Sequence, residues 1–194
     1  MERPKPFPSP PSEVSHSIVR LKYSEALTAA IGIGRVEAHK RNRETLGESF
    51  VLVGLIASGE LNHLFSQIPF YTPRDLIREI LETQLIVPQR KSPDGSPEPK
   101  KPIEELLNSA SLQRSFDRAN VFANRQSIRE GEDNRLVRVS DVLEAFAANS
   151  EGFTSGFFID LGMDARLFAM GEHQDERRML LRREEREKEK FPDA

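Results

Sequence analysis

The sequence predicts an all-α fold of eight helices, arranged as two pseudo-twofold-related four-helix repeats packed together. Three observations lead to this prediction. Apolar residues recur at the spacing of an α-helix, the same spacing occurs in both halves of the chain, and no segment keeps the period-two alternation of a strand. One four-helix unit alone would bury too little surface to be stable, so we expect the halves to pack face to face.

Prolines divide the chain into segments. Most of the 13 prolines fall within 4–11 and 88–102, two stretches that lack apolar periodicity and are typical of tails and linkers. The predicted parts are a disordered Pro-rich tail at 1–15, a first repeat at 16–87, a Pro-rich linker at 88–102, a second repeat at 103–171 and a charged helical tail or linker at 172–194.

The first helix of each predicted repeat carries one apolar stripe. Its residues lie at offsets 0, +4, +7 and +11 in both halves, which places them on one helix face. They are Leu27, Ile31, Gly34 and Ala38 in the first half and Leu112, Phe116, Ala119 and Ala123 in the second. Ser24 is placed to cap the first of these helices, and Ser109 or Ser111 the second.

Three more helices follow in each half. The second helix of the first half is apolar all round, so we expect it to be central and buried. Thr72, Pro73 and Asp75 give the last helix of that half a cap, a first-turn proline and a first-turn acid, and Asp164 caps its counterpart. The expected segments are 49–56 with 140–147, 64–68 with 157–161, and 76–81 with 165–170. Only 85–87 and 136–139 are ambiguous with strands.

Four segments resemble the duplicated N-terminal domain of Clp-type AAA+ unfoldases. Tyr23-Ser24 is similar to the aromatic-Thr/Ser start of that repeat, and residues 46–56 resemble its Val-Gly-Thr-Glu-His-Leu-Leu-Leu-Ala-Leu-Leu run. Residues 111–119 resemble its Leu-Gln-Arg-Val-Leu-Asp-Arg-Ala helix, and 161–164 its Leu-Gly-Val-Asp turn. The resemblance covers about 23–171. It implies the duplicated all-helical fold.

Two departures from the family pattern bear on function. The His that precedes the buried Leu run is Phe50 in one half and Asp141 in the other. The Leu-Gly-Val-Asp turn is replaced by Ile-Pro-Phe-Tyr at 68–71. These changes weaken the transfer of partner-contact residues from the family to this chain.

The resemblance implies binding without chemistry. The family's domain receives adaptor proteins or substrate segments for an AAA+ motor, and in the type VI secretion branch it recognises sheath subunits. This chain has no Gly-x-x-x-x-Gly-Lys-Ser/Thr phosphate loop, so it does not itself hydrolyse ATP. We therefore expect a protein or peptide partner, which is an adaptor, a substrate or a sheath-type helix, and an associated AAA+ motor.

Two surfaces are candidates for that contact. The first is a groove at the start of each repeat, formed by Tyr23, Ser24, Leu27, Ser111 and Leu112 with Phe157 and Phe158. Core packing is the alternative for these two phenylalanines, together with Phe153 and Phe168. The second surface is a basic cluster of Arg35, Lys40, Arg41 and Arg43 beside His39, which either contacts an acidic partner or is a solvated helix end.

The sequence offers little for catalysis or cofactors. His16, His39, His63 and His173 show no helical metal-site spacing, and Cys is absent, so we expect no metal and no cofactor. Gly32 and Gly34 lie inside a helix and indicate close helix packing rather than a dinucleotide loop. The segment 152–156 is interpreted as a helix start capped by Thr154 or Ser155 rather than as a nucleophile turn. An unrecognised helical enzyme is the least favoured hypothesis.

Charge and hydropathy bear on partner class and location. A net charge of -3 with interspersed signs indicates neither a nucleic acid nor a membrane as partner. The longest apolar run, 50–57, is far shorter than the roughly 20 residues that span a bilayer, and we expect a cytoplasmic protein. The alternative function is a structural module that joins an oligomeric assembly or a motor ring through the charged helix at 172–190.

Overall fold

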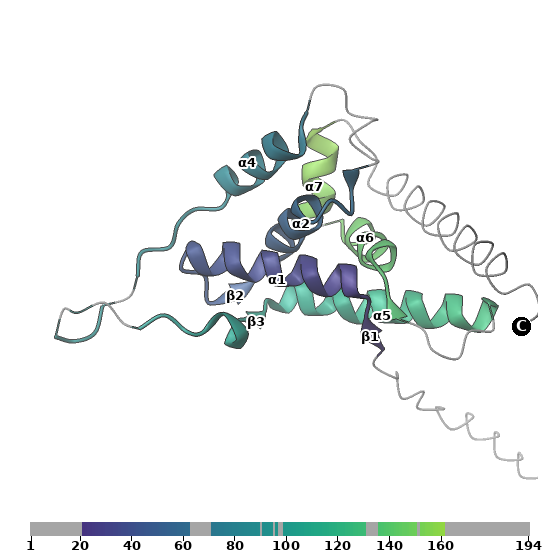
Figure 1. Cartoon of the computed structure of the whole chain (residues 1–194), viewed down its shortest axis with the longest axis horizontal. Coiled ribbons are helices and arrows are strands. Elements are labelled where there is room, and N and C mark those ends of the chain that lie inside the picture. The colour runs from purple at the N-terminus through teal and green to yellow at the C-terminus, as the bar shows by residue number, and fades with distance from the viewer. Residues whose placement is uncertain are drawn as a thin grey trace, which may run out of the picture.

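The computed structural model describes residues 21–62, 71–89, 91–94, 96, 99–130, 136–150 and 152–161. Within these ranges the chain is mostly helical (Figure 1). Its elements are β1 (Lys22–Tyr23), α1 (Glu25–Lys40), β2 (Thr45–Leu46), α2 (Glu48–Ala57), α4 (Pro73–Thr83), a 3-10 turn (Ile103–Glu105), β3 (Leu107–Asn108), α5 (Ala110–Glu130), β4 (Leu136–Val137), α6 (Val139–Ala147) and α7 (Phe153–Asp160). The predicted helices at 64–68 and 165–170, and both tails, lie outside the described residues.

The two stripe helices form where their caps predict. In α1 the Ser24 side chain accepts a hydrogen bond from the Leu27 amide at 3.3 Å, and all four stripe residues are buried. In α5 the Ser109 hydroxyl accepts from the Leu112 amide at 3.2 Å, so Ser109 rather than Ser111 is the cap. The apolar members of that stripe are buried as well.

Helix α2 is the centre of the core and crosses α1 closely. Every residue from 48 to 56 is buried, which confirms the expectation for a helix that is apolar all round. The crossing depends on two glycines. A Cβ on Gly34 would lie 2.5 Å from the Phe50 carbonyl oxygen, and a Cβ on Gly54 would overlap the Ala30 carbonyl. Close packing is therefore why Gly34 is small, whereas a Cβ on Gly32 would meet nothing within 4 Å.

Four two-residue strands were not expected from the sequence. They form two parallel pairs, in which β1 pairs with β4 and β2 pairs with β3. Each pair joins a strand that precedes a helix of the first half to a strand that precedes a helix of the second. Two residues are too short to show period-two alternation, so only the ambiguous segment 136–139 gave any signal. The other ambiguous segment, 85–87, has no strand.

Contacts between helices assemble one core from both halves. Helix α2 packs against α1, α4 and α7, and α5 packs against α6. The buried cluster takes its largest fully buried side chains from both halves, among them Leu27, Leu52, Leu112 and Phe146.

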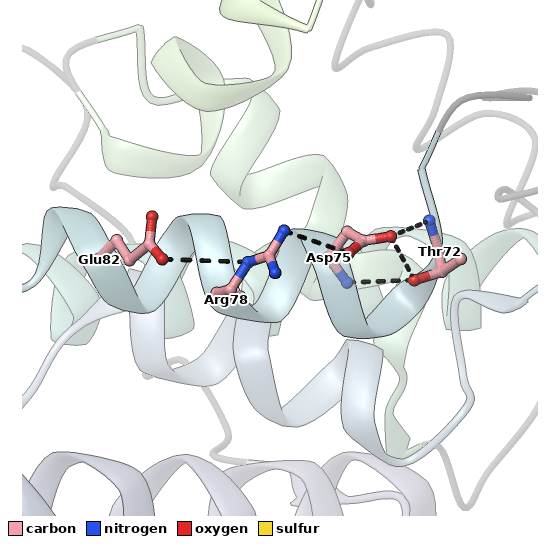
Figure 2. A network of polar contacts seen from close by, with 4 residues as sticks. All are labelled: Thr72, Asp75, Arg78 and Glu82. Atoms are coloured by element: carbon pink, nitrogen blue, oxygen red, sulfur yellow. Dashed lines mark hydrogen bonds and ion pairs between the residues drawn. The ribbon is translucent and has the colours of Figure 1, made fainter.

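The predicted cap of α4 is confirmed, and the predicted cap of α7 is wrong. Thr72 and Asp75 form a reciprocal capping box with Pro73 in the first turn, as predicted (Figure 2). At α7 the cap is Gly152, which makes no side-chain hydrogen bond. Thr154 and Ser155 are instead buried in the first turn, because the helix begins at Phe153, two residues before the start that a Thr154 cap would give.

Candidate functional site

The predicted groove residues fall into two groups by exposure. Leu27 and Leu112 are completely buried, and Phe157 and Phe158 are buried with their rings edge to face. Ser24 and Ser111 are half-buried, and Tyr23 is 38% exposed. The four apolar side chains therefore belong to the core in this conformation. Tyr23 is the most exposed of the predicted groove residues.

Tyr23 lies at the edge of the β1–β4 pair. Its ring packs on Phe116, with centroids 5.4 Å apart, and its register partner is the buried Val137. The backbone on either side is fixed, because the Ser24 amide donates to the Val137 carbonyl at 2.9 Å and the Leu21 amide donates to Asn120 Oδ1 at 3.0 Å. The pair thus presents an aromatic side chain on a rigid backbone.

Both strand pairs also display an exposed leucine. Leu136 is in register with Lys22 in the first pair, and Leu107, which is 70% exposed, is in register with Thr45 in the second. Cross-strand partners share a face, so each leucine lies on the same face as an exposed polar residue. These leucines and Tyr23 are accessible apolar side chains on backbone held by pairing.

Ser111 belongs to a buried polar network rather than to an open groove. At its centre is Glu48, in the first turn of α2 and 5% exposed. Glu48 Oε1 accepts hydrogen bonds from Ser115 Oγ at 2.8 Å, Asn149 Nδ2 at 2.9 Å and Ser111 Oγ at 3.4 Å. The network therefore joins α2 to α5 and to the turn between α6 and α7.

The second carboxylate oxygen of Glu48 has no hydrogen-bond partner among the described residues. A Cβ on Gly152 would lie 2.6 Å from it and 2.7 Å from Asn149 Nδ2, so a larger residue at this position would displace these side chains. The N-terminus of α2 favours the negative charge, and the partners of the other oxygen are neutral donors. Glu48 is not among the predicted site residues, although an acid in the first turn of an otherwise apolar helix was a signal for it.

The residues of the basic cluster have different surroundings. Lys40 pairs with Glu37 at 2.6 Å, and Arg35 and Arg41 are half-buried. Arg43 lies instead on a cavity of about 400 Å³, where it is joined by Lys100 and Lys101. The sequence did not indicate this grouping, because about 57 residues separate Arg43 from the two lysines and only the folded linker brings them together.

The described ranges hold no candidate metal site and no candidate membrane span. Among those residues there is no group of three or more His, Cys, Asp or Glu placed to hold a metal ion. None of the helices described is both long and apolar enough to cross a bilayer.

Comparison with known proteins places the fold. No protein-family model matches the chain, and no curated protein matches it. Among solved structures, the N-terminal domain of the caseinolytic protease associated chaperone ClpD from Arabidopsis thaliana is similar, with a TM-score of 0.55 and 15% sequence identity. The match covers 80% of this chain and 95% of that chain.

The chain therefore has a mostly helical fold like that of a Clp N-terminal domain. At 15% identity the likeness concerns the fold alone. The full count of eight helices in two repeats stays a prediction, because two of the expected helices lie outside the described residues.

Proposed function

We propose that this chain is a non-catalytic protein-interaction domain that binds adaptor or substrate segments for a Clp-type AAA+ chaperone or unfoldase in the cytoplasm. The observation that supports it is the fold shared with the N-terminal domain of ClpD, a chaperone associated with a protease. Protein quality control and type VI secretion are both compatible with such a domain, and the captured partner decides between them.

The accessible apolar side chains suit this role. Tyr23, Leu107 and Leu136 lie on short paired strands, so a partner would not need to order them before binding. Each contributes at most about 25 cal/mol per Å² of apolar surface that is buried. A few such side chains give weak, transient binding, with a Kd in roughly the micromolar range.

Affinity capture with the full chain as bait tests the partner class. We expect recovery of a Clp-type ATPase, an adaptor or a sheath protein. In parallel, fluorescence anisotropy should show saturable binding of carbamidomethylated lysozyme, an unfolded basic protein that represents a substrate and is not attracted to basic side chains. Failure of both experiments would contradict the proposal.

Surface variants distinguish a docking site from general stickiness. Tyr23→Ala should weaken lysozyme binding severalfold because it removes an exposed ring. Val36→Ala is the matched control, since Val36 is 37% exposed against 38% for Tyr23 and lies towards the other end of α1. The predicted groove residue Leu27 cannot be tested in this way, because it is completely buried and Leu27→Asp would place a charge in the core and unfold it. Equal binding by both alanine variants would exclude Tyr23 from the site.

A further inference from the structure

A cavity of about 400 Å³ lies where α1 ends. Its walls come from the turn between α1 and β2 and from both ends of the Pro-rich segment at 88–102. The residues that matter for its chemistry are His39, Arg43, Lys100, Lys101, Val87 and Pro99. Its volume is within the lower range of pockets that hold small ligands or individual side chains.

Two hydrogen bonds hold the start of the Pro-rich segment against the end of α1. The Val87 amide donates to the Arg41 carbonyl at 3.1 Å, and Asn42 Nδ2 donates to the Val87 carbonyl at 2.8 Å. Asn42 has a φ of 56°, in the left-handed region that Asn tolerates better than most residues. The turn and the segment are thus clamped together, and the cavity is a built feature of the fold.

The charge around the cavity is positive and unbalanced. Arg43, Lys100 and Lys101 line it with one carboxylate, that of Glu44. Within the described ranges none of these three cations forms an ion pair, in contrast to Lys40 nearby, which pairs with Glu37. Arg43 Nε is buried and has no acceptor among the described residues, as is also true of Arg35 Nε and Arg41 Nε, but Arg43 alone of these three arginines lines the cavity. A buried donor of this kind is stabilised when a ligand supplies the missing acceptor.

We propose that this cavity binds an acidic segment of a partner protein, with a Glu or Asp carboxylate between Arg43 and the lysine pair. The proposal rests on the proposed function as a protein-interaction domain and adds the chemistry of the bound segment. Val87, Pro88 and Pro99 provide an apolar wall for the aliphatic part of the acidic side chain. No Phe, Tyr or Trp lines the cavity among the described residues, so it lacks the stacking surfaces that single-stranded nucleic acid uses.

Fluorescence anisotropy on the full chain tests the proposal with a labelled peptide of alternating Glu and Ala. We expect saturable binding that weakens with added salt, and no binding of the matching Gln and Ala peptide. The double variant Lys100→Gln/Lys101→Gln should weaken binding about tenfold, since it removes two charge contacts made by exposed side chains. Backbone amide signals of residues 39–45 and of Val87 and Gln89 should shift on titration in NMR spectra.

The matched control is Lys22→Gln/Arg74→Gln, which changes the net charge equally at exposed positions that do not line the cavity. It should change the affinity less than twofold, and circular dichroism should show that both double variants are folded. Equal weakening by the control, equal binding of the Gln peptide, or tighter binding of a labelled oligothymidine would overturn the proposal. If the unmodified chain binds lysozyme but not the Glu peptide, the cavity proposal is refuted and the proposed function stands. If it binds the Glu peptide but not lysozyme, only the Tyr23 site is refuted.

Discussion

At the scale of single residues, glycines decide how closely α1 and α2 approach. Gly54→Ala should destabilise the protein by about 2–3 kcal/mol or more, because its Cβ would overlap the Ala30 carbonyl and the helices would have to separate. Gly32→Ala is the matched control, since a Cβ there meets nothing within 4 Å and alanine favours the helix by about 0.5–1 kcal/mol. In urea denaturation, the free energy of unfolding should thus fall for Gly54→Ala and rise for Gly32→Ala. A neutral Gly54→Ala would refute the close crossing.

Glu48 makes a second prediction at this scale. Glu48→Ala should destabilise the fold by about 2–4 kcal/mol, because the buried Ser115 hydroxyl and the half-buried Asn149 amide group lose the carboxylate that accepts their hydrogen bonds. Glu37→Ala is the control, since Glu37 pairs only with the exposed Lys40 and such pairs contribute about 0–1 kcal/mol. Chemical denaturation measures both. Similar effects of the two variants would mean that the network contributes little to stability.

At the scale of elements, the capping box of α4 predicts a dependence on pH. Hydrogen bonds from the Thr72 side chain and backbone, helped by Arg78 and Arg74, lower the pKa of Asp75 (Figure 2). A folded-state pKa below the unfolded value stabilises the helix at neutral pH, and this stability is lost as the pH falls below about 4 and through the lowered pKa. An NMR titration should show the Asp75 carboxyl protonating below the ordinary Asp pKa of about 3.9. An Asp75 carboxyl that titrates at the ordinary Asp pKa would argue against the Thr72–Asp75 capping box.

Removing the other half of the same box tests the element directly. Thr72→Ala should cost about 1 kcal/mol because the Asp75 amide loses its acceptor. Glu82→Gln removes only a long, exposed contact with Arg78 at 3.9 Å, so it should change stability by less than about 0.5 kcal/mol. Urea denaturation of Thr72→Ala and Glu82→Gln measures both free energies of unfolding. Equal free energies of unfolding for the two variants would contradict a stabilising cap.

At the scale of the whole molecule, the strand pairs make the two halves depend on each other. The pairs β1–β4 and β2–β3 each take one strand from either side of the Pro-rich segment, and α2 of the first half packs on α7 of the second. We therefore expect the fragments 1–94 and 95–194 to show little helix alone in circular dichroism, and to regain helix when mixed. The uncut chain should unfold in one transition. A fragment with its own cooperative transition would disprove this interdependence.

The sequence alone predicted the helices whose signals are local. Apolar stripes, the caps Ser24 and Thr72 and the buried centre at 49–56 depend only on residues within a few positions of one another, so spacing was enough to find them. Tertiary structure decided the features that join distant segments. These are the short strand pairs, the burial of Leu27 and Leu112 in the core, the Glu48 network and the grouping of Arg43 with Lys100 and Lys101. Each depends on contacts across tens of residues, and local spacing carries no information about such contacts.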